Sequence, residues 1–495
     1  MNQVSNWYKS FVIYKDVRVI RLLLLGFSSG LPILLIFSTL SLWLKSAGID
    51  RSTITLFSWA GLSYSFKFLW APVIDKLPII FLTNNLGHRK SWLILSQLFL
   101  ISLLILIGFV DPKYNLELIA VLIILIGFSS ATQDAMIDTY RIETGPSKLQ
   151  SAMSGMYIVG YRLGMIAAGA GSLMLASWFG GDENSYNANA WQKTYMIMAL
   201  LQSIGLFCTY FSPEPESKRL LIKGFNDRLK LITVFIFSII GFISVFNFFP
   251  NLANNDPLIK GMLTIIEFLL GFSFMFVIFY SSIKIKFIKK QILISTFWDP
   301  FFNFLKKYGA MAILILIIIG FYRVADIVMG VMANLFYSDK GYTLSQIATY
   351  SKFWGLLATI FGGLIGGILA SRYDNYFILL LGAILAAATN LLFALLSSLE
   401  PKIIYLIFVI VADNVSAGIA SVAFVAFLSS LTNTHFTTSQ YALFTSFMLF
   451  FPKLIGGYSG EMVNTFGYFN FFTITAFMGL PVIILILCLK NKHQE

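Results

Sequence analysis

The chain has 495 residues, of which 58% are hydrophobic and 12% are charged, and its mean hydropathy is +0.80. This composition leaves too little polar surface for a soluble globule of this size, so it indicates a multi-pass membrane protein without a sizeable soluble domain. The net charge of +12 needs no nucleic-acid partner, because basic loops orient a membrane protein.

About fourteen hydrophobic stretches are long enough to cross a ~30 Å hydrocarbon core, and each predicts a helix because a helix satisfies its own backbone polar groups. An even number of crossings puts both chain ends on one side. With these boundaries about 23 Lys and Arg residues fall on that side and about 7 on the other, which predicts cytoplasmic termini. In chain order the stretches lie near 18–44, 53–75, 92–110, 116–139, 150–178, 191–211, 230–249, 260–283, 309–332, 345–370, 376–397, 403–430, 438–458 and 468–489.

The stretches divide into six, two and six, separated by the polar segments SPEPESKRLLIKGFNDRLK and KIKFIKKQILISTFWDPFFNFLKK. This division predicts an N-terminal six-helix bundle (1–211), linkers with an inserted helix pair (212–308) and a C-terminal six-helix bundle (309–495). Two six-helix halves related by an axis along the membrane normal are the architecture of major facilitator transporters. Glycine runs at 160–172 and 362–369 carry small residues at four-residue spacing, which predicts close helix packing.

A lysine lies on the second hydrophobic stretch, in FKFLWAPVID, which holds Lys67 and ends at Asp75. A charge at the centre of a membrane helix costs at least ~2.5–3.5 kcal/mol, so such a residue needs a partner, an aqueous cavity or the interface. Lys67 therefore indicates a transport pathway.

The fourth stretch ends in SSATQDAMIDTYRIE, where Asp134 and Asp138 share one helix face and Arg141 follows three residues later. Two ionised carboxylates this close repel each other, while Arg141 favours a charged Asp138, so Asp134 is the better candidate to carry a proton. The same residues could instead form a gate or latch at the cytoplasmic end, or be solvated at the interface.

Further charged residues lie inside other stretches. Arg162 is too deep to reach the interface, so it either binds an anionic substrate or pairs with an acid such as Asp134. Arg323 and Asp326 can neutralise each other on one helix or contact substrate. The remaining candidates for substrate binding are Lys352, Asp413 and Lys453.

Signatures of catalysis are absent from the sequence. It has no GxxxxGK[ST] nucleotide loop and no HExxH or other metal-binding spacing among its three histidines. Cys208 and Cys488 show no CxxC spacing. We therefore expect no enzyme activity, no catalytic residues, no metal and no cofactor.

Several segments together resemble the AmpG-type muropeptide permeases of the major facilitator superfamily. They are LLLLGFSSGLP (22–32), FKFLWAPVID followed by GHRKSW, SATQDAMID (130–138), GYRLGM (160–165), KFWGLLATIFGGLIGGIL (352–369) and DNVSAGIASVAFVAFLSSL (413–431) leading into TSQYALF. They occur in both halves and keep the family's order. The chain departs from the pattern in TGPSKLQ, in Lys453 where an arginine is expected, and in the inserted helix pair.

The resemblance implies a symporter of the bacterial inner membrane that uses protons to import anhydro-muropeptides, the fragments recycled from peptidoglycan. We separately expect the protein to be a monomer. Lys67, Asp75, Asp134, Asp138 and Arg162 then fall on the family's charged positions. We also assign Asp75, Arg89 and Lys90 to a loop that moves during transport, and we expect contacts with membrane lipid.

Two alternatives remain open from the sequence. The same fold could carry another anionic metabolite, such as a nucleotide or an acyl-CoA, or the chain could be a scaffold or sensor that has lost transport.

Overall fold

The computed structural model describes residues 13–49, 54, 57, 62–181, 186–216, 221–248, 257–342, 346–433, 435–456 and 459–494, and every element in them is a helix. Ten continuous helical stretches in this part are long and apolar enough to cross a membrane. The expected all-helical, multi-pass fold is thus confirmed, while the number of fourteen crossings stays a prediction. The start of the second predicted crossing lies largely outside the described residues.

The first group of helices runs from residue 13 to residue 210 and packs around two apolar cores. One core is built around Leu31, Trp43 and Tyr195, and the other around Leu69 and Trp70. We call this set the first helix group. Its members are η1 (Ile13–Lys15), α2 (Val17–Ile36), α3 (Ser38–Ser46), α5 (Leu62–Phe66), η3 (Lys67–Leu69), α6 (Ala71–Lys76), α7 (Leu82–Leu86), α8 (His88–Gly108), α9 (Leu116–Thr144), α10 (Ser147–Ile166), η4 (Ala167–Gly171), α11 (Ser172–Trp178) and α12 (Ala188–Tyr210).

The last group of helices packs around two further cores, which contain Phe424 and Phe444 in one and Phe336 and Phe472 in the other. We call this set the last helix group. It comprises α17 (Met311–Phe321), α18 (Val324–Asp339), η6 (Ile347–Trp354), α20 (Gly355–Arg372), α21 (Asn375–Ser398), α22 (Ile403–Leu431), α23 (Thr437–Gly456), α24 (Ser459–Met478) and α25 (Leu480–Gln494).

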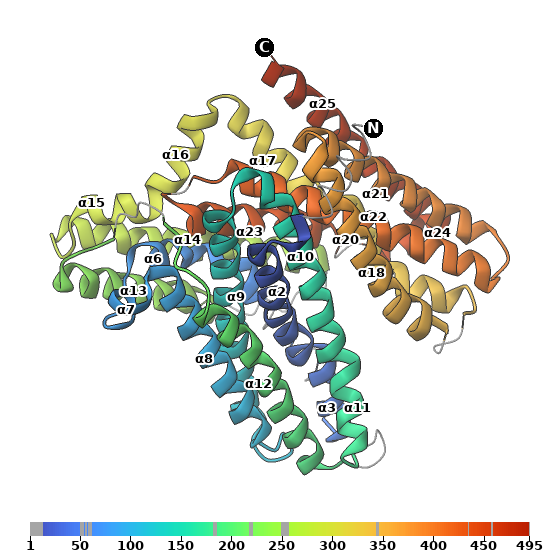
Figure 1. The fold of residues 1–495 in the computed structure, drawn as a ribbon, viewed down its shortest axis with the longest axis horizontal. Coiled ribbons are helices and arrows are strands. Elements are labelled where there is room, and N and C mark those ends of the chain that lie inside the picture. The colour runs from blue at the N-terminus through green and yellow to red at the C-terminus, as the bar shows by residue number, and fades with distance from the viewer. Residues whose placement is uncertain are drawn as a thin grey trace.

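The intervening segment consists of α13 (Phe225–Phe248), α14 (Pro257–Lys284), α15 (Lys290–Leu293), η5 (Ile294–Trp298) and α16 (Asp299–Tyr308). Leu231 of α13 and Phe279 of α14 belong to the same apolar core as Trp70. The aromatic rings of Phe68 and Phe272 lie 6.2 Å apart. The inserted helices therefore pack on the first helix group, beside η3 and α6 (Figure 1).

Glycines allow the closest helix packing in each group. A Cβ at Gly30 of α2 would overlap the carbonyl oxygen of Tyr161 in α10, and one at Gly160 would overlap that of Leu23. In the last helix group, Gly362 of α20 lies in the same way against the backbone of Val415 in α22. The small-residue runs thus bring helix backbones together, as predicted.

The two helix groups meet at the end of the molecule that holds the start of α2 and the end of α25, which we call the terminal side. Here α10 lies against α20, and α23 lies against η3, α6 and α9. Tyr14 Oη donates to Leu364 O at 3.2 Å, and Ser151 Oγ donates to Ala370 O at 3.2 Å. Figure 1 shows the two groups diverging toward the opposite side, where α3 and α11 lie apart from α18 and α24.

Candidate functional site

A buried ion-pair network lies on the terminal side and joins three segments of the first helix group. Arg89 Nη1 lies 2.7 Å from Asp75 Oδ1, and Arg89 Nη2 lies 2.7 Å from Glu143 Oε1. All three side chains are at most 3% exposed. Removing one member of such a network leaves a buried charge uncompensated, which typically costs about 3–5 kcal/mol.

Asp75 also bonds to the last helix group. Its Oδ2 accepts hydrogen bonds from Ser439 N at 2.8 Å and from Ser439 Oγ at 2.5 Å. Ser439 lies in the first turn of α23, where backbone N–H groups lack helical partners and the helix dipole favours negative charge. Asp75 therefore caps a helix of the other group, and this contact can exist only while the groups touch on the terminal side.

Glu214 holds the start of α8, which carries Arg89 and Lys90. Its Oε1 and Oε2 accept hydrogen bonds at 3.0 Å from Arg89 N and Lys90 N. Lys90 Nζ donates to Tyr210 O at 2.9 Å. The helix start is thus positioned by the segment that follows α12, so that Arg89 points at Asp75.

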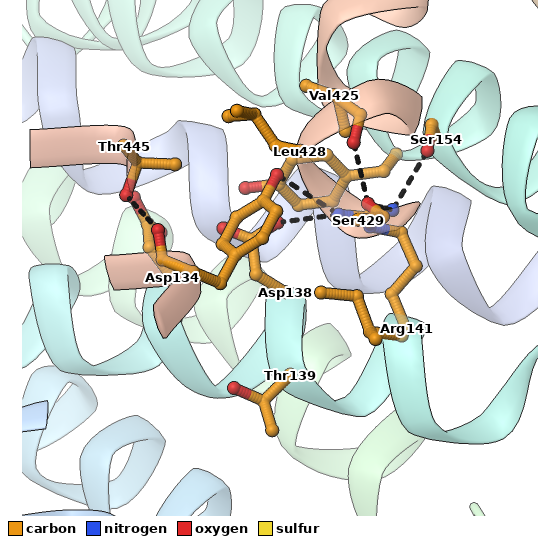
Figure 2. A network of polar contacts seen from close by, with 12 residues as sticks. Asp134, Asp138, Thr139, Arg141, Ser154, Val425, Leu428, Ser429 and Thr445 are labelled. Carbon is orange, nitrogen blue, oxygen red and sulfur yellow. Dashed lines mark hydrogen bonds and ion pairs between the residues drawn. The ribbon is translucent and has the colours of Figure 1, made fainter. Parts of the chain in front are cut away.

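Arg141 connects α9 with α10 and with two helices of the last group. Its Nη1 donates to Ser154 Oγ at 2.9 Å and to Ser429 Oγ at 2.8 Å, and its Nη2 donates to Tyr441 Oη at 3.1 Å (Figure 2). Asp138 Oδ1 lies 3.3 Å from Arg141 Nη2. The guanidinium is fully buried, so it binds the two groups together at the terminal side.

Thr139, two residues before Arg141 on α9, adds a further contact between the groups. Its Oγ1 donates to Thr438 Oγ1 at 3.0 Å, and Thr438 neighbours the residue that Asp75 caps. We call the contacts of Asp75, Arg141 and Thr139 with α22 and α23 the terminal gate.

Asp134 is buried one turn further from the terminal side. Ser29 Oγ donates to its Oδ1 at 2.5 Å and also lies 2.9 Å from Tyr157 Oη. Lys67 is buried too, and its charge acts on the carboxylates of both Asp134 and Asp138. Lys67, Asp134 and Asp138 therefore form one cluster inside the first helix group.

Arg162 does not pair with Asp134. Among the described residues its one hydrogen bond is a contact of 3.6 Å from Nη1 to Met165 Sδ. The charges that act on it belong to Arg323 and Asp326 of the last helix group. The alternative in which Arg162 is an internal partner of Asp134 is thus not the arrangement found.

Arg323 and Asp326 form the internal pair that their spacing allows. Arg323 Nη2 lies 2.5 Å from Asp326 Oδ2, and Nη1 lies 3.3 Å from Ser421 Oγ. Asp413 lines the same small cavity and interacts with the Thr389 side chain. Among the described residues Arg323 thus pairs with Asp326, while Asp413 lines the same cavity without an ion pair to Arg323.

The two remaining predicted residues lie elsewhere. Lys453 is exposed, and its Nζ lies 3.3 Å from Ser65 Oγ of the first helix group. Lys352 belongs to the π-helical η6, and its side chain is outside the described residues. In the described ranges no cluster of three or more His, Cys, Asp or Glu side chains could hold a metal ion.

Sequence reasoning missed several members of these networks. Glu143 lies two residues after Arg141, so the spacing of acids on the fourth stretch is a signal that points to it. Glu214 lies in the segment predicted as a linker, where an acidic residue gives no sign of a structural role. Ser439, Ser429 and Tyr441 carry no charge, and their role depends on contacts between distant segments. They lie in segments that carry the family resemblance, but no local signal in the sequence identifies their bonding role.

The chain matches known transporters over nearly its full length. The family model described as Major Facilitator Superfamily matches residues 22–457. Putative transporter AmpG 4 of Rickettsia conorii is 32% identical over 480 residues, which cover 97% of this chain and 98% of that protein. The Anhydromuropeptide permease of Escherichia coli strain K12 is 28% identical over 484 residues, which cover 97% of this chain and 82% of that protein.

Solved structures agree at the level of the fold. The proton:xylose symporter XylE superposes with a TM-score of 0.61 at 11% identity, covering 98% of this chain and 96% of its own. FucP in its outward conformation gives a TM-score of 0.62 at 12% identity, with coverages of 95% and 98%. These matches confirm the expected major facilitator fold and a transporter rather than an enzyme. The chain belongs to the Major Facilitator Superfamily and, within it, to the AmpG group of membrane transporters.

Proposed function

We propose that this protein imports anhydro-muropeptides across the bacterial cytoplasmic membrane, driven by protons, with both chain ends in the cytoplasm and one chain as the working unit. The names of the relatives support the cargo class. Such cargo carries peptide carboxylates, so it needs cations that are not already neutralised by the protein.

The proposal is supported chiefly by the environment of Arg162. It is half-buried, and none of the described carboxylates lies within ion-pair distance of it. A guanidinium binds a carboxylate through two parallel hydrogen bonds, and it stays charged even when partly desolvated. Arg323 of the last helix group is already paired with Asp326. A cargo carboxylate at Arg162 would therefore bind a cation that no described carboxylate neutralises.

Proton coupling follows from competition for Lys67. While Asp134 is ionised, its carboxylate attracts the buried Lys67. A proton on Asp134 removes that partner, so Lys67 becomes available to a cargo carboxylate. Loss of the proton toward the cytoplasm restores the Lys67–Asp134 attraction and weakens cargo binding. The cycle then couples one proton to one cargo molecule through a single cation.

The closed terminal gate supports an alternating-access cycle. With the chain ends in the cytoplasm, the contacts of Asp75 and Arg141 close the cytoplasmic side, and the groups diverge toward the periplasm. Cargo would enter from the periplasm, and opening would require the Asp75–Ser439 and Arg141–Ser429 bonds to break.

The direct test is uptake of radiolabelled anhydro-muropeptide into proteoliposomes containing the full chain, with an imposed pH gradient. We expect uptake that collapses when a protonophore is added. No uptake by folded protein, together with competition by unlabelled nucleotides or acyl-CoA in a binding assay, would replace the muropeptide with another anionic metabolite.

Two substitutions separate coupling from cargo binding. Asp134→Asn should abolish gradient-driven uptake and its pH dependence while cargo exchange between loaded liposomes and medium persists. Uptake by Asp134→Asn that still follows the proton gradient would refute the role of Asp134. Arg162→Gln should raise KM about 10- to 100-fold, because a hydrogen-bonded charge contact contributes about 1.5–3 kcal/mol. Lys148→Gln, which removes an exposed cation outside the predicted site, serves as the control and should leave KM within about twofold.

A further inference from the structure

The inserted segment forms an apolar groove that the transport cycle does not use. The groove has a volume of about 350 Å³ and lies between α14, η5 and α16. Phe276, Tyr280, Trp298 and Phe302 are between 38% and 61% exposed along it. Aromatic walls on the outside of a membrane protein accommodate hydrocarbon chains, because no polar group has to lose its partner.

A second groove of about 270 Å³ continues the first toward the terminal gate. Phe276, Phe279, Phe297 and Trp298 line both. The second groove also includes Pro72 of α6 and Ser439 and Leu443 of α23. Its walls therefore come from both helix groups, and Ser439 is the residue that Asp75 caps. The groove is complete only while the terminal gate is closed.

Lysines lie at the end of this groove. Lys284, Lys286, Lys289 and Lys290 are exposed in the turn that joins α14 to α15, whose neighbours Ile283 and Leu293 line the groove. Lys289 Nζ is 3.0 Å from Asp227 Oδ2. In the described part of the chain, no carboxylate forms an ion pair with the other three lysines. Three positive charges thus border an apolar groove, on the same side as the gate.

This combination fits a molecule with hydrocarbon chains and an anionic head. Lysines near a membrane surface attract anionic lipid, and each strengthens the attraction about fivefold. α16 follows directly and has phenylalanines on its first turns and Lys306 and Lys307 at its end, as expected for a helix in the plane of the interface. A soluble anion would gain nothing from the aromatic walls.

We propose that this groove binds an anionic phospholipid, whose acyl chains occupy the aromatic walls and whose phosphate contacts Lys284, Lys286 and Lys290. The lipid spans the junction between α6 and α23, so it binds better when the terminal gate is closed. By linkage, bound lipid then shifts the transporter toward the gate-closed state. The proposal does not depend on the identity of the cargo.

The test uses quenching of Trp298 fluorescence by lipids with brominated acyl chains. The full chain is placed in nanodiscs with increasing fractions of brominated phosphatidylglycerol, or of brominated phosphatidylcholine, in an unbrominated background. The signal of Trp298 is the difference between the parent protein and Trp298→Phe. Because three lysines each strengthen the attraction about fivefold, we expect half-maximal quenching at a roughly 100-fold lower fraction of phosphatidylglycerol.

Three variants decide between a specific site and bulk lipid. The triple substitution Lys284→Gln, Lys286→Gln and Lys290→Gln should remove the preference, and replacement of the same lysines by arginine should keep it. The matched control removes the same charge elsewhere on the exposed surface, through Lys15→Gln, Lys148→Gln and Lys223→Gln, and should keep the preference.

Asp75→Asn, which weakens the gate, tests the link to conformation and should reduce the preference at least twofold. Equal quenching by the two lipids, or a preference that survives the triple glutamine variant, would overturn the site. An unchanged preference in Asp75→Asn would overturn its dependence on the gate.

Discussion

Replacing Asp75 by Asn tests whether the terminal gate sets the conformational equilibrium of the transporter. The substitution keeps the size of the side chain and removes its charge. In the gate-closed state Asp75 accepts two hydrogen bonds from Ser439 and pairs with Arg89. The Arg89 pair lies within the first helix group and persists when the gate opens, whereas the Ser439 bonds exist only while it is closed.

The size of the effect follows from these contacts. A hydrogen bond to a charged acceptor contributes about 1.5–3 kcal/mol, and a negative charge at a helix N-terminus about 0.3–1 kcal/mol. Asn retains one acceptor oxygen, but its amide nitrogen is a donor. That donor would face another donor, either the Arg89 guanidinium or the backbone N–H of Ser439. We therefore expect a loss of about 3 kcal/mol from the closed state relative to the open one, or roughly a 100-fold shift of the equilibrium.

Spin-label distance measurement can follow this shift. Labels at Met174→Cys in α11 and Leu335→Cys in α18, both exposed and toward the opposite side, report the separation of the groups in a background with Cys208→Ser and Cys488→Ser. Asp75→Asn should convert much of the long-distance population to a shorter distance, because closure on that side accompanies opening of the gate. The matched control is Asp374→Asn, an exposed acid before α21 that makes no capping bond.

If the distance distribution of Asp75→Asn equals that of the parent protein, the Asp75–Ser439 contact does not set the conformational equilibrium. A shift of equal size in Asp374→Asn would also refute it, since it would trace the effect to net charge on that side rather than to the contact with α23.

Further predictions concern packing, capping and the charged pair of the last helix group. Gly30→Ala should lower the free energy of unfolding by at least about 1–3 kcal/mol, because the added Cβ would overlap the Tyr161 carbonyl. Gly330→Ala is the control and should not lower it, because its Cβ would meet open space. Thermal unfolding in detergent measures both variants. Glu214→Gln should lower the free energy of unfolding by about 1–2 kcal/mol, because it weakens the two hydrogen bonds that Glu214 accepts at the start of α8. Chemical denaturation measures this loss, and a clearly smaller value would show that the cap does not stabilise the fold. Asp326→Asn should leave Arg323 without its ion-pair partner, so we expect a changed cargo affinity with an unchanged spin-label distance; a changed distance and unchanged affinity would make the pair part of the gate instead.

The sequence predicted the structure correctly where the physical signal is local. The glycine runs at 160–172 and 362–369 predicted close packing, and the helices α10 and α20 that carry them lie against the backbones of α2 and α22. The spacing of Arg323 and Asp326 predicted their ion pair, because residues three apart share one helix face. In both cases the information lies within one helical turn or one repeated spacing.

Arg162 shows where the local signal ends. The sequence indicated that its charge must face the interior, but left a cargo carboxylate and Asp134 as equal candidates. In the fold Asp134 bonds to Ser29 and attracts Lys67, while the charges of Arg323 and Asp326 act on Arg162. The choice depends on how α9 and α10 are rotated about their axes, and hydropathy does not report rotation when nearly every face is apolar.

The sequence alone determined the environment and the fold family, because the length and number of apolar stretches are imposed by the thickness of the bilayer and by the need to satisfy every backbone polar group. It also singled out the charged residues, since their cost in a membrane makes each one informative. Only the tertiary structure decided their partners. Asp75 bonds to Ser439, 364 positions away, and Arg141 bonds to Ser429, 288 positions away. Such contacts arise when two separately packed helix groups close against each other, and no spacing within either group encodes that distance.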